Sequence, residues 1–379
     1  MRVPAFVVGL TALLAVPALL VAQDATDPAA SDATPNVAGQ AAPVQVARAE
    51  TKPKKAAKAK PNKAAKPPPV PAKELFGAVT TPAPLAARSI GFYAKGCVAG
   101  AQALPVDGSA WQAMRLSRNR NWGHPNLIKL IERFAVDAKQ KDGWPGLLVG
   151  DMSQPRGGPM LTGHASHQVG LDADVWFTPM PDHRLTGKER EELSAASMLA
   201  EDGVSVDPKV WSDTRVKLLK RAASYPQVER IFVHPAIKKA VCEATKDEKD
   251  RGWLSKVRPY WGHYYHFHIR IACPKGSTGC EAQPHVNAKD DGCGKELTTW
   301  LKRVKPPTAP PPKIAKPRRP KPPLTLAQLP AACQAVLASG APPTADTPST
   351  PAAEPASKAA APASKPAPAV GVAKTSLPK

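Results

Sequence analysis

Apolar and polar positions along the chain follow a helical period in some segments and a strand-like alternation in others. The helical period, with apolar side chains three or four residues apart, runs through residues 126–140, 212–224 and 234–244. In the first segment Leu127, Ile131 and Phe134 fall on one helix face. Ser212 is an N-cap candidate for the second helix, and Pro235 suits the first turn of the third.

Strand-like runs rich in Val, Ile, Leu and aromatic residues lie between and after these helices. They cover residues 146–152, 171–177, 228–234 and 263–271. No internal repeat is visible. The mixed order of elements predicts an α+β fold, with a small central antiparallel sheet flanked by helices.

The patterned part of the chain is bounded by segments of a different composition. Residues 74–340 form one region long enough for a single hydrophobic core, although a Pro-rich segment, 304–323, interrupts it. Residues 23–73 and 341–379 are rich in Pro, Ala and Lys and have too little apolar surface to offset the entropy of ordering. The sequence therefore predicts one folded domain between a disordered linker and a disordered tail.

The first 22 residues have the features of a secretory signal peptide. Arg2 precedes an apolar stretch from Ala5 to Val21, and small residues follow it. That stretch is shorter than the roughly 20 residues of a membrane-spanning helix, so an uncleaved anchor is the less favoured alternative. We expect an exported protein with no transmembrane segment after signal removal.

The formal net charge of +21 raises nucleic acid as a partner, but the distribution of the charge argues against it. Much of it lies in the Pro-, Ala- and Lys-rich segments 50–73 and 301–323, which contain no aromatic residue that could stack on a base. We expect these basic segments to contact the anionic cell envelope. The alternative is a solvated extended spacer with no dedicated partner.

The cysteine count is even, which in an exported protein favours disulfides over thiolate metal sites. No CxxC pair is present, which further weakens a zinc–cysteine interpretation. Only Cys273 and Cys280 are close enough in the sequence to suggest a pair.

The segment WGHYYHFHIRIACP holds the histidines His263, His266 and His268. In an extended strand His266 and His268 share one face, while Phe267 and Ile269 share the other. A single strand histidine is usually a satisfied structural residue, and a pair on one face strengthens the case for metal binding without deciding it.

A second cluster lies in GGPMLTGHASHQVGLDADVWF, which contains His164, His167, Asp172 and Asp174. The two aspartates share one strand face and repel each other, and a divalent cation or a histidine would offset that repulsion. A solvent-facing acidic strand edge is the alternative, but it leaves the two histidines unexplained.

Combined, the two clusters predict a hydrolytic zinc site. His167, Asp174 and His268 form the two-histidine, one-carboxylate set that catalytic zinc uses, with a position left for water. His266 would lie beside that water and act as a general base or stabilise the developing oxyanion.

Four segments, RNRNWGHP, QPRGGPMLTGHASHQVGLDADVW, VHPAIK and WGHYYHFHIRIACP, closely resemble the penicillin-insensitive murein endopeptidases. These are periplasmic enzymes that cut peptidoglycan cross-links, and the resemblance covers roughly residues 74–340. Their histidine seven residues before an aspartate, followed by a distant HxH, belongs to a wider group of zinc peptidases that includes lysostaphin and the D-Ala-D-Ala carboxypeptidases.

The resemblance implies residue roles, a periplasmic location and a reaction. It assigns zinc to His167, Asp174 and His268 and catalysis to His266. It places His164 and His263 at the same site, with His164 contacting metal in some states. The implied reaction is hydrolysis of the D-alanyl–meso-diaminopimelyl amide of peptidoglycan. The implied disulfides are Cys97–Cys333, Cys242–Cys293 and Cys273–Cys280.

Other polar residues keep two interpretations. Asp172 either supports a ligand from behind or merely packs. Arg156 either binds a substrate carboxylate from its glycine-rich loop or ties that loop down. His124 and His234 each precede a proline at a predicted helix start, which favours capping over catalysis.

Serine chemistry has little support in the sequence. The only S-x-x-K match is Ser376–Lys379 in the predicted tail, and GxSxG and HExxH are absent. Two rival functions remain: a zinc carboxypeptidase that trims terminal D-Ala, and a non-catalytic wall-binding protein that holds a structural metal.

Overall fold

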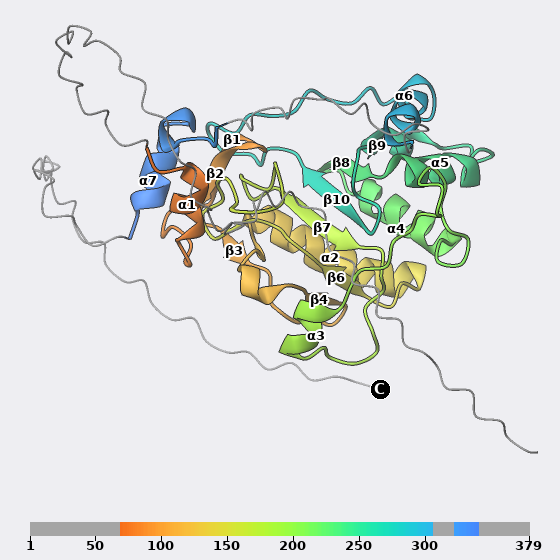
Figure 1. Ribbon diagram of the computed structural model, residues 1–379, viewed down its shortest axis with the longest axis horizontal. Coiled ribbons are helices and arrows are strands. Elements are labelled where there is room, and N and C mark those ends of the chain that lie inside the picture. The colour runs from red at the N-terminus through yellow and green to blue at the C-terminus, as the bar shows by residue number, and fades with distance from the viewer. Residues whose placement is uncertain (1–68, 306–321, 341–379) are drawn as a thin grey trace, which may run out of the picture. The chain divides into compact units, whose positions relative to one another are not determined.

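A six-stranded sheet with the order β4–β6–β7–β10–β8–β9 lies at the centre of the protein (Figure 1). The computed structural model describes residues 69–305 and 322–340. The strands are β4 (Trp111–Ala113), β6 (Leu147–Val149), β7 (Asp172–Trp176), β8 (Val228–Val233), β9 (Val257–Pro259) and β10 (His266–Ile271). The predicted signal peptide, most of the predicted linker and Pro-rich segment, and the predicted tail lie outside the described residues.

The middle of the sheet is antiparallel, as predicted. β10 pairs with β7 on one side and β8 on the other, both antiparallel, whereas the outer pairs β4–β6 and β8–β9 are parallel. The register places His268 opposite Asp174 and Arg270 opposite Asp172. The α+β fold is therefore confirmed, with parallel outer pairs that the alternation of residues did not reveal.

Helices α2 (Pro125–Asp142) and α4 (Asp213–Ser224) share the main core with one face of this sheet. The Phe134 ring of α2 lies 6.3 Å from the Phe267 ring of β10, centroid to centroid. Because side chains alternate along a strand, His266 and His268 point away from this core. The packing thus leaves the opposite face of β10 available for polar chemistry.

The predicted histidine caps are present. The His124 side chain accepts a hydrogen bond from the Asn126 backbone N–H at 3.2 Å, at the start of α2. His234 does the same for Ala236 at the start of α5 (Pro235–Ala244). Capping, rather than catalysis, is confirmed for both histidines.

The remaining elements surround the sheet. The strands are β1 (Arg88–Phe92), β2 (Lys95–Ala99), β3 (Gln102–Ala103) and β5 (Trp122–Gly123). The α-helices are α1 (Ala72–Gly77), α3 (Gly187–Glu192), α6 (Lys295–Val304) and α7 (Ala332–Ala338), and the 3-10 helices are η1 (Leu116–Arg118), η2 (Gly252–Lys256) and η3 (Leu326–Gln328). No helix among the described residues has the length and apolar character needed to cross a bilayer.

The two ends of the described chain meet in a second, smaller core, which we call the terminal clasp: α1, β2 and residues 324–338. Its buried members include Phe76, Cys97, Cys333 and Val336. The Ala72 backbone N–H donates to the Leu324 carbonyl at 2.7 Å. The C-terminal segment therefore belongs to the same domain, and α1 begins two residues before the predicted domain start at residue 74.

Three disulfides cross-link the domain, and they are the pairs that the family resemblance implies. Cys97–Cys333 closes the terminal clasp over a sequence separation of 236 residues. Cys242–Cys293 and Cys273–Cys280 have separations of 51 and 7 residues. Removal of loop entropy from the unfolded chain makes the longest of these loops the most stabilising in a chain-entropy account.

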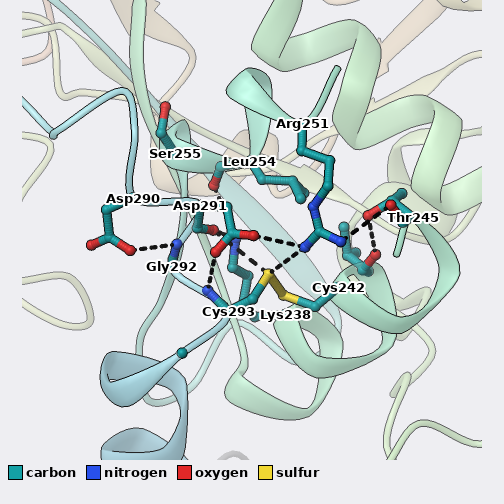
Figure 2. The surroundings of a disulfide bond; sticks show 12 residues. Lys238, Cys242, Thr245, Arg251, Leu254, Ser255, Asp290, Asp291, Gly292 and Cys293 are labelled. Atoms are coloured by element: carbon teal, nitrogen blue, oxygen red, sulfur yellow. Dashed lines mark hydrogen bonds and ion pairs between the residues drawn. A yellow bond between two sulfur atoms is a disulfide. The ribbon is translucent and has the colours of Figure 1, made fainter. Parts of the chain in front are cut away.

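A buried lysine lies next to one of these disulfides (Figure 2). Lys238 of α5 has a fully buried side chain, and its Nζ donates to the carbonyls of Leu254 at 2.9 Å and Asp291 at 2.5 Å. Burial, followed by repulsion from Arg258, lowers the pKa of Lys238 to about 7. A neutral amine has two N–H groups, which match the two carbonyls.

This burial predicts a specific pH dependence of stability. The unfolded lysine titrates at 10.5 and the folded one at about 7, so the unfolded state binds more protons between these values. The free energy of unfolding therefore rises with pH in that window and does not change through this group below it. Lys238→Met should remove about 2 kcal/mol of the stability that the protein gains between about pH 7 and about pH 9.

Denaturant unfolding at the two pH values measures this gain for the protein and for both variants. Lys239→Met is the matched control, because the Lys239 side chain is 44% exposed and pairs with Glu243 on the surface of α5. The control should keep the full gain. If Lys238→Met kept the full gain in the free energy of unfolding between these pH values, the gain would not come from the lowered pKa of Lys238.

Candidate metal centre

Strands β7 and β10 and the loop before β7 bring the predicted site residues together. Asp174 and His268 are direct cross-strand partners. The loop supplies His164 and His167, whose ring centroids lie 4.4 Å apart, and the His167 ring lies 4.5 Å from that of His268. Two distant histidine clusters of the sequence thus form one site.

The loop before β7 has an unusual backbone that the glycines make possible. Gly157 has a φ of 67°, and a Cβ there would lie 2.0 Å from the Gln168 carbonyl oxygen, so only glycine fits. His167 itself has a φ of 66°, which costs a non-glycine residue about 1–2 kcal/mol. Its backbone N–H donates to Asp172 at 3.0 Å, which holds this strained conformation.

Four imidazoles surround the carboxylate of Asp174. His167 Nε2 and His268 Nδ1 lie 3.4 and 3.2 Å from its Oδ1, and His164 Nδ1 and His266 Nε2 lie 3.5 and 3.6 Å from its Oδ2. Ligand atoms of His164, His167 and Asp174 all fall within 4.8 Å of one another. His268 is not in that group of three, but its Nδ1 contacts Asp174. The geometry therefore accommodates the predicted ligands His167, Asp174 and His268 together with His164.

Among the residues that the structure describes, Asp174 has no lysine or arginine as an ion-pair partner. Its carboxylate is 4% exposed, and within residues 69–305 and 322–340 its ion-pair contacts are all with histidines. Burial alone would raise the pKa of Asp174, but the surrounding histidines, His266 foremost, hold it well below its usual value. A buried carboxylate without a fixed positive partner is costly, and a divalent cation would offset that cost.

Several buried polar atoms in the cluster also lack a hydrogen-bond partner. Within the described part of the chain they are both ring nitrogens of His167, Nε2 of His268, Oδ1 of Asp174 and Nδ1 of His266. Unpaired buried donors and acceptors are rare in proteins, and imidazole nitrogen with carboxylate oxygen is the donor set that zinc prefers. The residues present therefore fit a zinc ion.

Asp172 supports His268 from behind. Its carboxylate accepts from Arg270 Nε at 2.8 Å and Nη2 at 3.2 Å, and its Oδ1 lies 3.0 Å from His268 Nε2, although not in hydrogen-bond geometry. Burial would raise the pKa of Asp172, but Arg270 and then His268 lower it strongly, so it stays charged. The contact leaves His268 Nδ1 directed at Asp174 and favours the supporting role over mere packing.

Arg270 is itself held in place by aromatic rings. Its guanidinium carbon lies 4.0 Å from the Tyr93 ring centroid and 5.1 Å from that of Phe232. The Tyr93 hydroxyl donates to the Ile271 carbonyl at 2.8 Å. These contacts fix the pair of Arg270 with Asp172, and through it the ring of His268.

Asp151, two residues after the end of β6, is a site residue that sequence reasoning missed. Its Oδ2 lies 3.0 Å from His164 Nε2, and it accepts from Arg120 at 2.9 Å and Arg118 at 3.1 Å. Burial would raise the pKa of Asp151, but His164 and the two arginines lower it. The only sequence signal is an aspartate directly after an apolar strand, which is common without function.

His263 lies next to His266 and His268 at the edge of the cluster. Its ring centroid lies 5.0 Å from that of His266, and its Nδ1 lies 2.9 Å from the Trp261 carbonyl. His263 has a φ of 53° and follows Gly262 at 68°. Trp261 precedes this tight turn, and its side chain is 66% exposed.

Arg156 lies outside the cluster. It is 6% exposed, and its guanidinium donates to the carbonyls of Thr81 at 3.1 Å, Val336 at 3.0 Å and Leu337 at 2.6 Å. Val336 and Leu337 belong to the terminal clasp, and Thr81 follows α1. The structure therefore gives Arg156 the tying role, and its alternative role as a carboxylate-binding residue has no support in these contacts.

Comparisons with known proteins find relatives that cover most of the described chain. Residues 89–338 match the family described as penicillin-insensitive murein endopeptidase. A Haemophilus influenzae protein of that name is 45% identical over 242 residues, which cover 61% of this chain and 78% of the relative. A Salmonella heidelberg protein of the same name is 42% identical over 259 residues, or 68% of this chain and 89% of the relative.

The support of His268 by Asp172 predicts a loss of metal affinity in Asp172→Asn. Removal of the charge should weaken metal binding roughly 10–100-fold, as loss of such supporting carboxylates does. Competition with a chromophoric chelator measures the affinity, and thermal unfolding in the presence of metal shows the folded fraction. Asp137→Asn is the matched control, because Asp137 is a buried carboxylate of α2 that accepts from the Tyr225 hydroxyl at 2.7 Å. Equal affinity losses in both variants would refute the specific support.

Proposed function

This chain belongs to the penicillin-insensitive murein endopeptidase family, and we propose that it is a zinc enzyme that cuts the D-alanyl–meso-diaminopimelyl amide of peptidoglycan cross-links. Membership makes it a peptidase that acts on murein. The observation that carries the zinc proposal is the buried Asp174 carboxylate with four imidazoles and no fixed cation among its described partners. The exact bond rests on the resemblance of the motifs.

The proposed zinc ligands are His167, Asp174 and His268, with His164 as an additional contact. When bound, zinc would polarise the scissile carbonyl and make water nucleophilic near neutral pH. Like His268, whose Nε2 contacts Asp172, His164 has a carboxylate at its Nε2, that of Asp151, which leaves Nδ1 on the side of Asp174.

The proposed role of His266 is proton transfer. Burial, partly offset by Asp174, lowers the pKa of His266 to about 4, so its imidazole is neutral near pH 7 and able to accept a proton. Its Nδ1 is buried without a hydrogen-bond partner. His266 would take a proton from the attacking water and deliver it to the leaving amine.

Murein lies in the cell envelope, so the enzyme works there, and we propose the periplasm as its location. The predicted signal peptide at residues 1–22 supports that location, and the basic segments 50–73 and 301–323 are proposed to contact anionic envelope polymers. These segments lie wholly or mostly outside the described residues and stay predictions.

Digestion of purified cross-linked muropeptide dimers tests the proposed reaction. We expect two monomers, and no cleavage after treatment with a chelator until zinc is restored. Mass spectrometry identifies the products. Release of free D-alanine instead would favour the carboxypeptidase, and tight wall binding without soluble products would favour a non-catalytic wall-binding protein.

Two histidine variants separate metal binding from proton transfer. His268→Ala should lose zinc and turnover together. His266→Ala should keep zinc and lose about 10²–10⁴-fold in rate, the usual worth of a general base. Zinc content and turnover are measured on the same preparations, with His285→Ala as the control because the His285 side chain is 91% exposed. Full zinc in His268→Ala, or unchanged turnover in His266→Ala, would remove that residue from its role.

A further inference from the structure

A half-exposed arginine lies beside the metal centre on the side of His164. Arg118 Nη1 donates to Asp151 Oδ2 at 3.1 Å, the same oxygen that lies 3.0 Å from His164 Nε2. The Arg118 side chain is 45% exposed, and that of His164 is 24% exposed. The two groups therefore both reach solvent and share one carboxylate oxygen of Asp151.

The charges around Asp151 do not balance. Arg120 is 9% exposed and already pairs with Asp151 at 2.9 Å, and its other nitrogen donates to the Thr162 carbonyl at 3.0 Å. One carboxylate thus faces two arginines. Among the described residues, Asp151 is the ion-pair partner of Arg118. The surplus positive charge lies on the arginine that solvent can reach.

Two other charged residues near this turn do not cancel the surplus. Arg115 donates its guanidinium N–H groups to the backbone carbonyls of Arg190, Glu191 and Leu193. The Glu191 carboxylate accepts from the backbone N–H and the hydroxyl of Ser117, at 2.9 and 2.8 Å. Arg115, Arg118 and Arg120 against Asp151 and Glu191 leave one net positive charge.

The backbone holds Arg118 in a fixed place. The 3-10 turn that ends at Arg118 is bracketed by Arg115 and Asn119, with φ of 56° and 50°. Asn119 accepts from Trp122 Nε1 at 2.7 Å and donates to the Thr80 carbonyl at 3.1 Å. Paired left-handed residues that are not glycine cost free energy, and such conformations occur preferentially at functional sites.

The chemistry of the proposed substrate supplies a matching anion. In the cross-link, the carbon that bears the scissile amide nitrogen also bears a free carboxylate. This charge is one carbon away from the bond that breaks, so it must lie close to the metal ligands during catalysis. A guanidinium binds a carboxylate with charge-assisted, often bidentate hydrogen bonds.

We propose that Arg118 binds the diaminopimelyl carboxylate next to the scissile amide and so selects the cross-link. The inference rests on the proposed function and names the group of the substrate that the site recognises. Asp151 orients both partners, because one of its oxygens contacts Arg118 and His164 together. Arg118 takes the role that the sequence offered to Arg156.

The test compares two cross-linked dimers that differ only at this carboxylate, which is free in one and amidated in the other. The protein should cleave the free form with the higher kcat/KM. Arg118→Gln should lose roughly 10–150-fold in kcat/KM on the free form, which corresponds to a charged hydrogen bond of about 1.5–3 kcal/mol. On the amidated form the variant and the protein should agree within about twofold, and Arg118→Lys should restore part of the loss on the free form.

Arg133→Gln is the matched control, because the Arg133 side chain is 70% exposed on α2 and also pairs with an aspartate. It should behave as the unmodified protein on both dimers. Zinc content is measured on every preparation and should be the same in all.

The outcomes separate the inference from the function on which it rests. An equal loss on both dimers, or a loss of zinc in Arg118→Gln, would overturn carboxylate recognition and give Arg118 a structural role. Equal cleavage of both dimers by the unmodified protein and by Arg118→Gln would also overturn it while the endopeptidase function stands. Failure of the unmodified protein to cleave either dimer in the presence of zinc would overturn the proposed function itself.

Discussion

The metal centre of this protein is arranged around one buried carboxylate. Asp174 lies in the middle of a sheet, opposite His268 in the β7–β10 register, and contacts four imidazoles without a fixed cation among the described residues. A charge in this environment is tolerable only if something positive is brought to it. The strained His167 backbone and the glycines of its loop are explained by the need to place ring nitrogens around that oxygen pair.

The negative charges of the two neighbouring carboxylates, Asp172 and Asp151, are neutralised by arginines rather than by histidines alone. This difference gives them another role than that of Asp174. Asp172 has Arg270 as a permanent partner, and Asp151 has Arg118 and Arg120. Each of the two also contacts one histidine of the cluster from its outer side. Arginine-paired carboxylates can thus orient imidazoles without competing for a cation, whereas Asp174 has an oxygen available for one.

Local patterns carried the predictable part of the site. The spacing of His266 with His268 and of Asp172 with Asp174 fixes their strand faces, because alternation is a property of the extended backbone. The helical period of α2 is also local, because it is read from apolar residues three or four positions apart. These residues form the face that packs against Phe267. Asp151 and Arg118 were not predictable in this way, because the contacts of Asp151 with Arg118 and His164 join separate segments of the chain. The long-range disulfides needed the family resemblance, and the parallel outer strand pairs have no signature in the alternation of residues.

The terminal clasp has a mechanical consequence. Cys97 and Cys333 are covalently joined, so the shortest bonded route from α1 to α7 runs through residues 72–97, the two sulfur atoms and residues 333–338. Tension applied across the two ends of the domain would follow that route, and every residue from 98 to 332 lies off it. The six-stranded sheet therefore lies off this covalent route, and the load reaches the histidine loop only through hydrogen bonds such as those of Gln168 with Tyr93 and Gly96.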